Sequence, residues 1–229
     1  VITRILPLDE PYVIVILLTS LAPCAPFLQQ MVGRGKGDMA FAGAFIPLVA
    51  IGTVVFMPLM APLLIPGLTI SAWALAKPLL LTILIPMIIG AAIRHYADTV
   101  ATKIFPAVKM IALISTLITV VFCLVLYGSA MLDTAGQFAL LSMTLFMIGM
   151  AFLAYRLGLG LKQNQRSVMA LGMGTRNIAA VLAAALAIPN ADSRIVTMVI
   201  MWTLWSVVLA VIAARIFARQ ADKLSAAHG

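Results

Sequence analysis

The residues best suited to bind a charged solute stand inside apolar stretches of this sequence. Thr175, Arg176 and Asn177 form a polar tripeptide within ALGMGTRNIAA at 170–180, and Gly172 and Gly174 come just before it. The guanidinium of an arginine is a planar fork of N–H donors that binds carboxylates in bidentate fashion. Hydroxyl and amide side chains add further hydrogen-bonding groups. The tripeptide therefore indicates a site for an organic anion.

A second group of unusual residues lies in SLAPCAPFLQQM at 20–31. Pro23 and Pro26 each remove a backbone donor and clash with the preceding turn of a helix. Cys24 stands between them, and the amides of Gln29 and Gln30 follow at once. A helix broken here would add its exposed amides to the same site. The structural alternative is that the prolines only bend the helix and the glutamines only link it to a neighbour.

The elements that must position these residues are membrane-spanning helices. Hydrophobic residues make up 64% of the 229, and the mean hydropathy is +1.16, far above the composition of soluble domains, in which about 45–50% of residues are apolar. A helix needs about 20 apolar residues to cross a hydrocarbon core of roughly 30 Å. Seven segments meet that length, and polar stretches separate them: approximately 11–32, 39–64, 74–93, 107–129, 137–158, 166–187 and 195–217.

Arg176 lies near the middle of the sixth of these segments. A central arginine costs about 2.5–3.5 kcal/mol on insertion scales, and its side chain is too far from either interface to reach water easily. A functional role is the interpretation that best explains this cost. The structural alternative is a guanidinium that bonds to carbonyls of a broken helix.

The distribution of charge indicates a membrane orientation rather than a nucleic-acid partner. The net charge of +8 would favour nucleic acid in a soluble protein, but here the cations fall on alternate flanks of the seven segments. Short cytoplasmic loops accumulate Lys and Arg, so the cation-rich flanks, and the C-terminus with them, are predicted to be cytoplasmic. The cation-rich flanks carry Arg34, Lys36, Arg94, Lys103, Lys109, Arg156, Lys162, Arg166, Arg215, Arg219 and Lys223, and the opposite flanks carry Arg4, Lys77 and Arg194.

The two interrupted segments are the first and the sixth, so they run in opposite directions through the membrane. Transporters built from inverted repeats place paired discontinuous helices near the midplane, where the N-termini of half-helices offer N–H groups and a positive dipole end to anions. Pro26 to Gln29 and Gly174 to Asn177 would provide such ends. The pair of breaks therefore favours a transporter.

At these residues the sequence resembles the bile acid:sodium symporter family. SLAPCAPFLQQMVGRGKGDMAFA at 20–42 resembles the broken fourth helix of that family, and ALGMGTRNIAAVLAAAL at 170–186 resembles its broken ninth helix. The resemblance implies helices four to ten of a ten-helix fold, with about three N-terminal helices missing. It also implies a core domain with the crossed helices, a panel domain, and alternating access between the two.

This sequence departs from the family at the positions that bind sodium in the members resembling it. A glutamate of those members falls at Ala170 and a glutamine at Gly174, while a Ser-Asn pair falls at Leu28 and Gln29, and further hydroxyl ligands fall at Ala42 and Ile46. Of these positions only Gln29 keeps a possible oxygen ligand, whereas a hard cation wants several oxygens. We therefore expect both sodium sites to be dismantled, with Arg176 supplying a fixed positive charge in their place.

Other functions remain as alternatives. Without sodium ligands, and without an Asp, Glu or His in mid-membrane, uniport and anion exchange stand beside symport. Cys24 resembles the thiolate of arsenite efflux permeases, a related group whose acidic partner residue is missing here. A non-transporting membrane sensor also fits seven helices. No group of nucleophiles, acids and bases indicates catalysis, so we expect no enzyme.

These observations predict an all-α integral membrane protein with seven transmembrane helices, two of them discontinuous and crossing, in an inverted-repeat transporter fold. Residues 1–229 would form a single transporter domain, with core-type helices at about 11–64 and 137–217 and panel-type helices at about 74–129. The predicted substrate-binding residues are Pro23, Cys24, Pro26, Gln29, Gln30, Gly172, Gly174, Thr175, Arg176 and Asn177. We expect a small organic anion and the lipid bilayer as partners, no nucleic acid, no cofactor and no bound metal, and a location in the bacterial inner (plasma) membrane.

Overall fold

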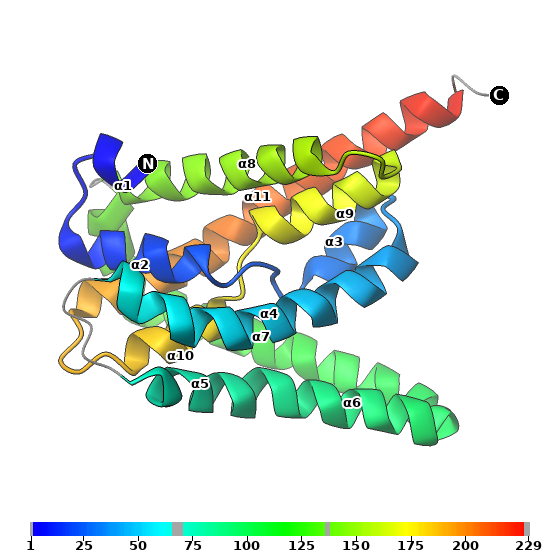
Figure 1. Cartoon of the computed structure of the whole chain (residues 1–229), viewed down its shortest axis with the longest axis horizontal. Coiled ribbons are helices and arrows are strands. Elements are labelled where there is room, and N and C mark those ends of the chain that lie inside the picture. Colours follow the sequence, from blue (N-terminus) through cyan, green and yellow to red (C-terminus); the bar gives the residue numbers. More distant parts are fainter. Residues whose placement is uncertain (1, 66–70, 136–137, 227–229) are drawn as a thin grey trace.

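The computed structural model describes residues 2–65, 71–135 and 138–226, and within these ranges the regular structure is helical, as predicted (Figure 1). The elements are α1 (Ile2–Ile5), α2 (Glu10–Ser20), α3 (Leu28–Arg34), α4 (Met39–Leu64), α5 (Ala72–Leu79), the π-helix η1 (Leu80–Leu84), α6 (Ile85–Tyr96), α7 (Asp98–Ala135), α8 (Ala139–Leu157), α9 (Gln163–Gly174), α10 (Ile178–Leu186) and α11 (Ser193–Ala226).

Five helical stretches of the described residues are long and apolar enough to cross a bilayer. They are α4, the continuous stretch from α5 to α6, the stretch Asp98–Thr134 of α7, α8, and α11. Many large apolar side chains of α4 and α7 are exposed, which is what lipid as the surrounding solvent permits. The chain is therefore an integral membrane protein. The count of seven spans and the inverted repeat stay predictions.

Two of the predicted spans are interrupted where the sequence indicated. In the first, α2 ends at Ser20 and α3 begins at Leu28, with the two prolines in the gap. In the second, α9 ends at Gly174 and α10 begins at Ile178. The prediction that these two segments are discontinuous is confirmed. The predicted bounds of α7 were too narrow, because its first turns carry charged residues such as Asp98 and Lys103 and do not look apolar.

The long helix α11 packs against most of the other elements. It contacts α2, α3 and α10 as well as α7, α8 and α9, and Figure 1 shows it running through the middle of the bundle. One buried cluster surrounds Trp202 of α11 together with α2 and α10, and a second contains Leu28 of α3, Leu171 of α9 and Ala210 of α11. Both broken segments are thus packed on a common helix, whereas the division into core and panel helices stays a prediction.

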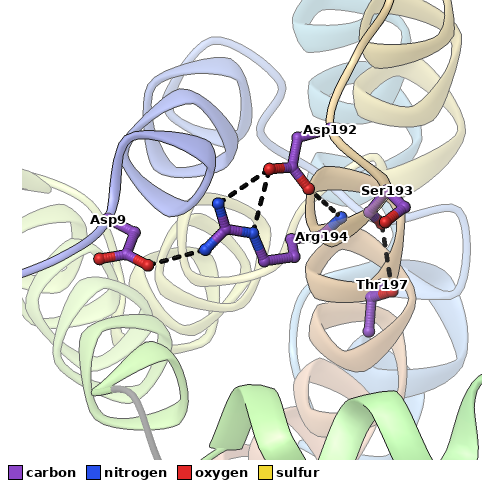
Figure 2. Close-up of polar contacts among 5 residues, drawn as sticks. All are labelled: Asp9, Asp192, Ser193, Arg194 and Thr197. Carbon is purple, nitrogen blue, oxygen red and sulfur yellow. Dashed lines mark hydrogen bonds and ion pairs between the residues drawn. The ribbon is translucent and has the colours of Figure 1, made fainter.

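Polar contacts join α11 to the first broken segment at both ends. At the start of α11, Arg194 forms ion pairs with Asp9, 2.7 Å away, and with Asp192, 2.8 Å away, while Thr197 donates to the carbonyl of Ser193 (Figure 2). At the far end of α11, Asp222 pairs with Lys36 of the loop after α3. These exposed contacts join both ends of the α2–α3 segment to α11.

The same loop is also joined to α9. Asp38 accepts from the backbone N–H of Phe41, at 2.9 Å, and from the amide of Gln165 at the start of α9, at 3.3 Å. These hydrogen bonds, that from Phe41 first, lower the pKa of Asp38. The carboxylate of Asp38 therefore caps α4 and also links α4 to the second broken segment.

We expect Arg194→Gln to lower the melting temperature of the purified protein by a small amount at pH 7. Hydrogen bonding to Arg194 lowers the pKa of Asp192, so the stabilisation from this pair is present above the ordinary aspartate pKa and disappears as the pH falls through the lowered one. The difference between variant and wild type should therefore vanish in acid. Thermal unfolding in detergent, at pH 7 and in acid, measures the difference in melting temperature. The control is Arg215→Gln, a change at an exposed residue farther along α11. A difference that persists in acid would contradict this assignment.

Candidate functional site

The segments between the half-helices cross and pair through their backbones. Pro23 and Arg176 form an isolated antiparallel bridge. The N–H of Asn177 donates to the carbonyl of Ala22 at 2.8 Å, and the N–H of Cys24 donates to the carbonyls of Gly172 and Thr175 at 2.9 and 3.0 Å. Each break thus satisfies backbone groups freed by the other, which is the condition for an interrupted helix within a membrane. We call these paired segments, 21–27 and 175–177, the crossing.

Thr175 and Asn177 use their side chains to build the crossing. The hydroxyl of Thr175 donates to the carbonyl of Leu171 at 2.8 Å and accepts from the N–H of Ala25 at 3.2 Å. The side-chain oxygen of Asn177 accepts from the N–H of Ala180 at 3.2 Å and caps α10. The N-terminus of α10 is therefore less open than the sequence led us to expect.

Cys24 has a strained backbone at the centre of the crossing. Its φ of +73° lies in the left-handed region, which a residue with a Cβ adopts at a cost of roughly 1–2 kcal/mol. The side chain is buried in the apolar cluster with Leu28 and Leu171. The two hydrogen bonds of its N–H offset the strain, so the conformation depends on the second broken segment.

Arg176 is fully buried at the crossing, with an exposed fraction of 0%. Its Nη2 donates to the carbonyl of Met173 at 2.6 Å, and the guanidinium carbon lies 4.6 Å from the ring centroid of Phe146 of α8. Its Nε and Nη1 have no hydrogen-bond partner among the described residues. No carboxylate of the described residues forms an ion pair with it. A buried charge in this state is costly unless an anion compensates it.

Two glycines allow the helices to approach at the crossing. A Cβ on Gly172 would overlap the ring of Phe45 on α4, and a Cβ on Gly174 would lie 2.9 Å from the Cβ of Ala151 on α8. The present packing of α9 against α8 therefore depends on glycine at 174, and a side chain at 172 would require the ring of Phe45 to move. This is a structural role for residues that the sequence singled out as substrate-binding.

The first broken segment sends only part of its predicted residues to the crossing. Pro26, Gln29 and Gln30 are exposed, and none of them lines the two cavities described below. Pro23, Cys24 and Pro26 all belong to the crossing, but of these three only Pro23 and Cys24 pair with the second broken segment through the backbone. The structure thus brings the tripeptide 175–177, Gly172 and Gly174 together with Pro23 and Cys24, and leaves the two glutamines apart from Arg176 on the surface of α3.

Two cavities reach the crossing. The larger, of about 560 Å³, lies between α8, α9 and α11 and extends from Arg156, Arg166 and Gln220 to Gly174 and Thr175. The smaller, of about 260 Å³, is bounded by Pro23 and by residues of α2 and α4 that include Ser20 and Thr53. Arg176 itself lines neither of these two cavities.

The positions at which the resemblance places sodium ligands are packed with carbon here. Leu28, Ala42 and Ile46 belong to the apolar cluster between α3, α4 and α9, and Ala170 is fully buried. Gln29 is exposed. Hard cations bind several oxygens at once, so these residues do not fit a sodium ion. Among the described residues, no three His, Cys, Asp or Glu side chains gather as a metal site.

Sequence analysis did not single out Phe146 or the carbonyl of Met173, which are the two groups that contact the guanidinium of Arg176. An aromatic residue in an apolar helix carries no signal of such a contact. Trp202 of α11 is a further neighbour of Phe146 that was not predicted from the sequence. In the structure it is fully buried, and its ring packs edge-on against Phe146 with the centroids 5.8 Å apart.

Comparison with known proteins gives one family and two relatives. The model of the family described as "Sodium Bile acid symporter family" matches residues 1–134, so the second broken segment lies outside the matched range. Two curated relatives, from Oryza sativa subsp. japonica and Arabidopsis thaliana, are both named "Probable sodium/metabolite cotransporter BASS3, chloroplastic". The rice protein is 28% identical over 121 residues, which are 52% of this chain and 29% of the relative. The Arabidopsis protein is 28% identical over 102 residues, 44% of this chain and 24% of the relative.

Proposed function

The chain belongs to the sodium bile acid symporter family, and from that premise we propose that it is a secondary transporter that moves a small organic anion across the membrane by alternating access. The chain aligns with less than a third of each relative's length, so the activity of those proteins is a guide and not a finding for this chain. The observation that carries the proposal is Arg176, a buried guanidinium without a counter-charge among the described residues, at the crossing of two discontinuous helices.

The anion meets Arg176 at the crossing, next to the backbone of Pro23 and Cys24 on one side and of Thr175 and Asn177 on the other. The two cavities that end at opposite segments of the crossing support this arrangement. One cavity ends at Pro23 and the other at Gly174 and Thr175, so the site could open toward either. Pro26, just before α3, and Gln29 and Gln30 on α3 are exposed, and we assign them to the approach rather than to contact with the bound anion.

The guanidinium of Arg176 supplies the positive charge that compensates the anion, a charge that a bound sodium ion would supply in a sodium cotransporter. The names of the relatives include sodium, but the residues at the family's sodium positions are apolar here apart from Gln29, and all of these apolar residues are buried except the half-buried Ile46. An arginine remains charged at any physiological pH. Transport of the anion therefore needs no sodium gradient in this proposal, and uniport or exchange becomes the mode.

The contacts along α11 support motion of the crossing as one body. Ion pairs at both ends of α11 join it to the first broken segment, and α9 also packs on it. We assign α2 to α4 and α8 to α11 to the core and α5 to α7 to the panel. The distribution of Lys and Arg supports a cytoplasmic C-terminus, and we assign the chain to a bacterial inner membrane.

Flux in proteoliposomes tests this function. The full chain is reconstituted and offered a panel of radiolabelled mono- and dicarboxylates and sulfonates, with sodium and pH gradients imposed separately and protein-free liposomes as the control. We expect saturable uptake of at least one anion in sodium-free buffer, and less than about a twofold gain from a sodium gradient, because no coupled ion adds its free energy to the transport. Binding of anions without flux would favour a sensor. A tenfold gain from sodium would contradict the fixed-charge proposal.

A further inference from the structure

Three buried side-chain nitrogen atoms of the described residues have no hydrogen-bond partner. They belong to two residues that both pack against the ring of Phe146. The atoms are Nε and Nη1 of Arg176 and Nε1 of Trp202. The guanidinium of Arg176 lies over the face of Phe146, and the indole of Trp202 packs against the same ring at an interplanar angle of 74°. Unpaired donors from α11 and from the crossing thus gather around one side chain of α8.

The neighbouring tryptophan makes this state unusual. Trp205 lies one turn farther along α11, and its Nε1 donates to the hydroxyl of Thr144 on α8 at 2.8 Å. Trp202 packs against the same helix but its N–H has no such acceptor. A buried donor without an acceptor costs about 1–3 kcal/mol, and buried polar atoms in native proteins nearly always have a protein, water or ion partner.

A neutral acceptor would satisfy the hydrogen bonds but not the charge. Arg176 is fully buried and forms no ion pair with the carboxylates of the described residues, and a buried charge requires an opposite one. The acceptor that satisfies both residues is therefore itself negatively charged. Arg176 and Trp202 each pack against the ring of Phe146, so an acceptor shared by the two has to be small.

We propose that Arg176 and Trp202 together bind one small monovalent anion, which accepts hydrogen bonds from Nε and Nη1 of Arg176 and from Nε1 of Trp202. The anion is either chloride or the carboxylate of the transported solute. For the second source the inference rests on the proposed function. Trp202 thereby becomes a residue that contacts the anion, which neither its type nor its place in an apolar helix would suggest.

The larger cavity gives such an anion a route. Its outer end carries Arg156 and Arg166, neither of which forms an ion pair among the described residues. Its inner end includes Met147 and Thr175, the chain neighbours of Phe146 and Arg176. An anion attracted by these two arginines would enter a cavity that reaches the chain neighbours of Phe146 and Arg176.

Equilibrium binding of radiolabelled chloride to the purified full chain tests the site, with displacement by acetate as the carboxylate probe. Trp202→Phe keeps the ring and removes the donor, and we expect it to weaken chloride and acetate binding about tenfold, the effect of one hydrogen bond to a charged group. Trp205→Phe is the matched control, because its N–H already has a partner in Thr144, and should bind as the wild type does. Equal affinity of the Trp202→Phe and wild-type proteins would overturn the proposal.

A second measurement is available if Trp202→Phe does not purify as a folded protein. The sequence has three tryptophans, Trp73, Trp202 and Trp205, so a Trp73→Phe, Trp205→Phe double variant keeps Trp202 as the single indole. A saturable change in its emission with chloride or acetate supports contact with the anion. The absence of any saturable change overturns it.

Flux experiments separate the two sources and separate this inference from the proposed function. If chloride is a resident ion, replacing it with gluconate lowers organic-anion flux. If the carboxylate of the solute occupies the site, chloride inhibits that flux competitively. Both results support the site. Flux that depends on Arg176 but is unchanged by Trp202→Phe and by chloride would overturn the site and leave the transporter proposal intact.

Discussion

Arg176→Gln should lower organic-anion flux by about tenfold to a hundredfold while leaving the protein folded. Hydrogen bonds to charged groups contribute about 1.5–3 kcal/mol, and each 1.4 kcal/mol is a factor of about ten in affinity. Glutamine keeps an N–H donor for the carbonyl of Met173, which accepts from Nη2 of Arg176, but it lacks the charge. The initial rate of uptake in proteoliposomes measures the effect.

Folding and flux should respond in opposite ways to this change. In the absence of an anion, Arg176 is a buried charge with two unpaired nitrogen atoms, so removing the charge should leave the melting temperature unchanged or raise it. Arg176→Lys keeps the charge without the planar fork and should retain intermediate flux. Arg219→Gln, an exposed change on α11, is the control. If Arg176→Gln instead lowered the melting temperature as well as the flux, the result would indicate the structural role, in which the guanidinium is a partner of helix carbonyls.

The breaks in the two helices could be predicted from the sequence because their causes are local. Pro23 and Pro26 cannot continue a helix, and Gly172 and Gly174 precede the most polar tripeptide of the apolar segments. Each signal depends on the residue types alone. The structure therefore agrees with the sequence on where the helices end, to within a few residues.

The partners of the polar side chains could not be predicted in the same way, because they are set by contacts between segments far apart in the chain. Thr175 bonds to the backbone of Ala25, 150 residues away, and Arg176 stacks on Phe146 of another helix. Gln29 and Gln30 look like ligands in the sequence, yet the rotation of the short helix α3 leaves them exposed. The sequence singles out the tripeptide, but it does not predict that Thr175 and Asn177 hold the crossing together while Arg176 has no ion pair among the described residues.

The sequence and the structure give different information about the positions that bind sodium in the family. The sequence shows only that Ala170, Ala42 and Leu28 lack oxygen ligands. The structure adds that the space is filled, since all three are fully buried and Leu28 and Ala42 belong to one apolar cluster. Restoring a single oxygen would therefore place an unsatisfied polar group in a packed core rather than rebuild a cation site.

Gly174→Val should destabilise the protein by about 1–3 kcal/mol, the cost of adding carbon atoms to a well-packed contact. The Cβ would lie 2.9 Å from the Cβ of Ala151 and 3.4 Å from the carbonyl oxygen of Met147, and both atoms belong to a rigid helix that cannot move aside locally. The change should separate α9 from α8, the helix that carries Phe146, and so withdraw Arg176 from its ring. We expect a lower melting temperature in detergent together with loss of anion flux.

Gly149→Val is the matched control, because Gly149 of α8 is a helical glycine like Gly174 of α9, but a Cβ there meets no atom within 4 Å. It introduces the same β-branched residue with the same modest loss of helix propensity relative to alanine. The melting temperature of this control should stay near that of the wild type. If the two variants melt alike, the contact between Gly174 and Ala151 does not determine how α8 and α9 pack, and the geometry that places Arg176 on Phe146 has another cause.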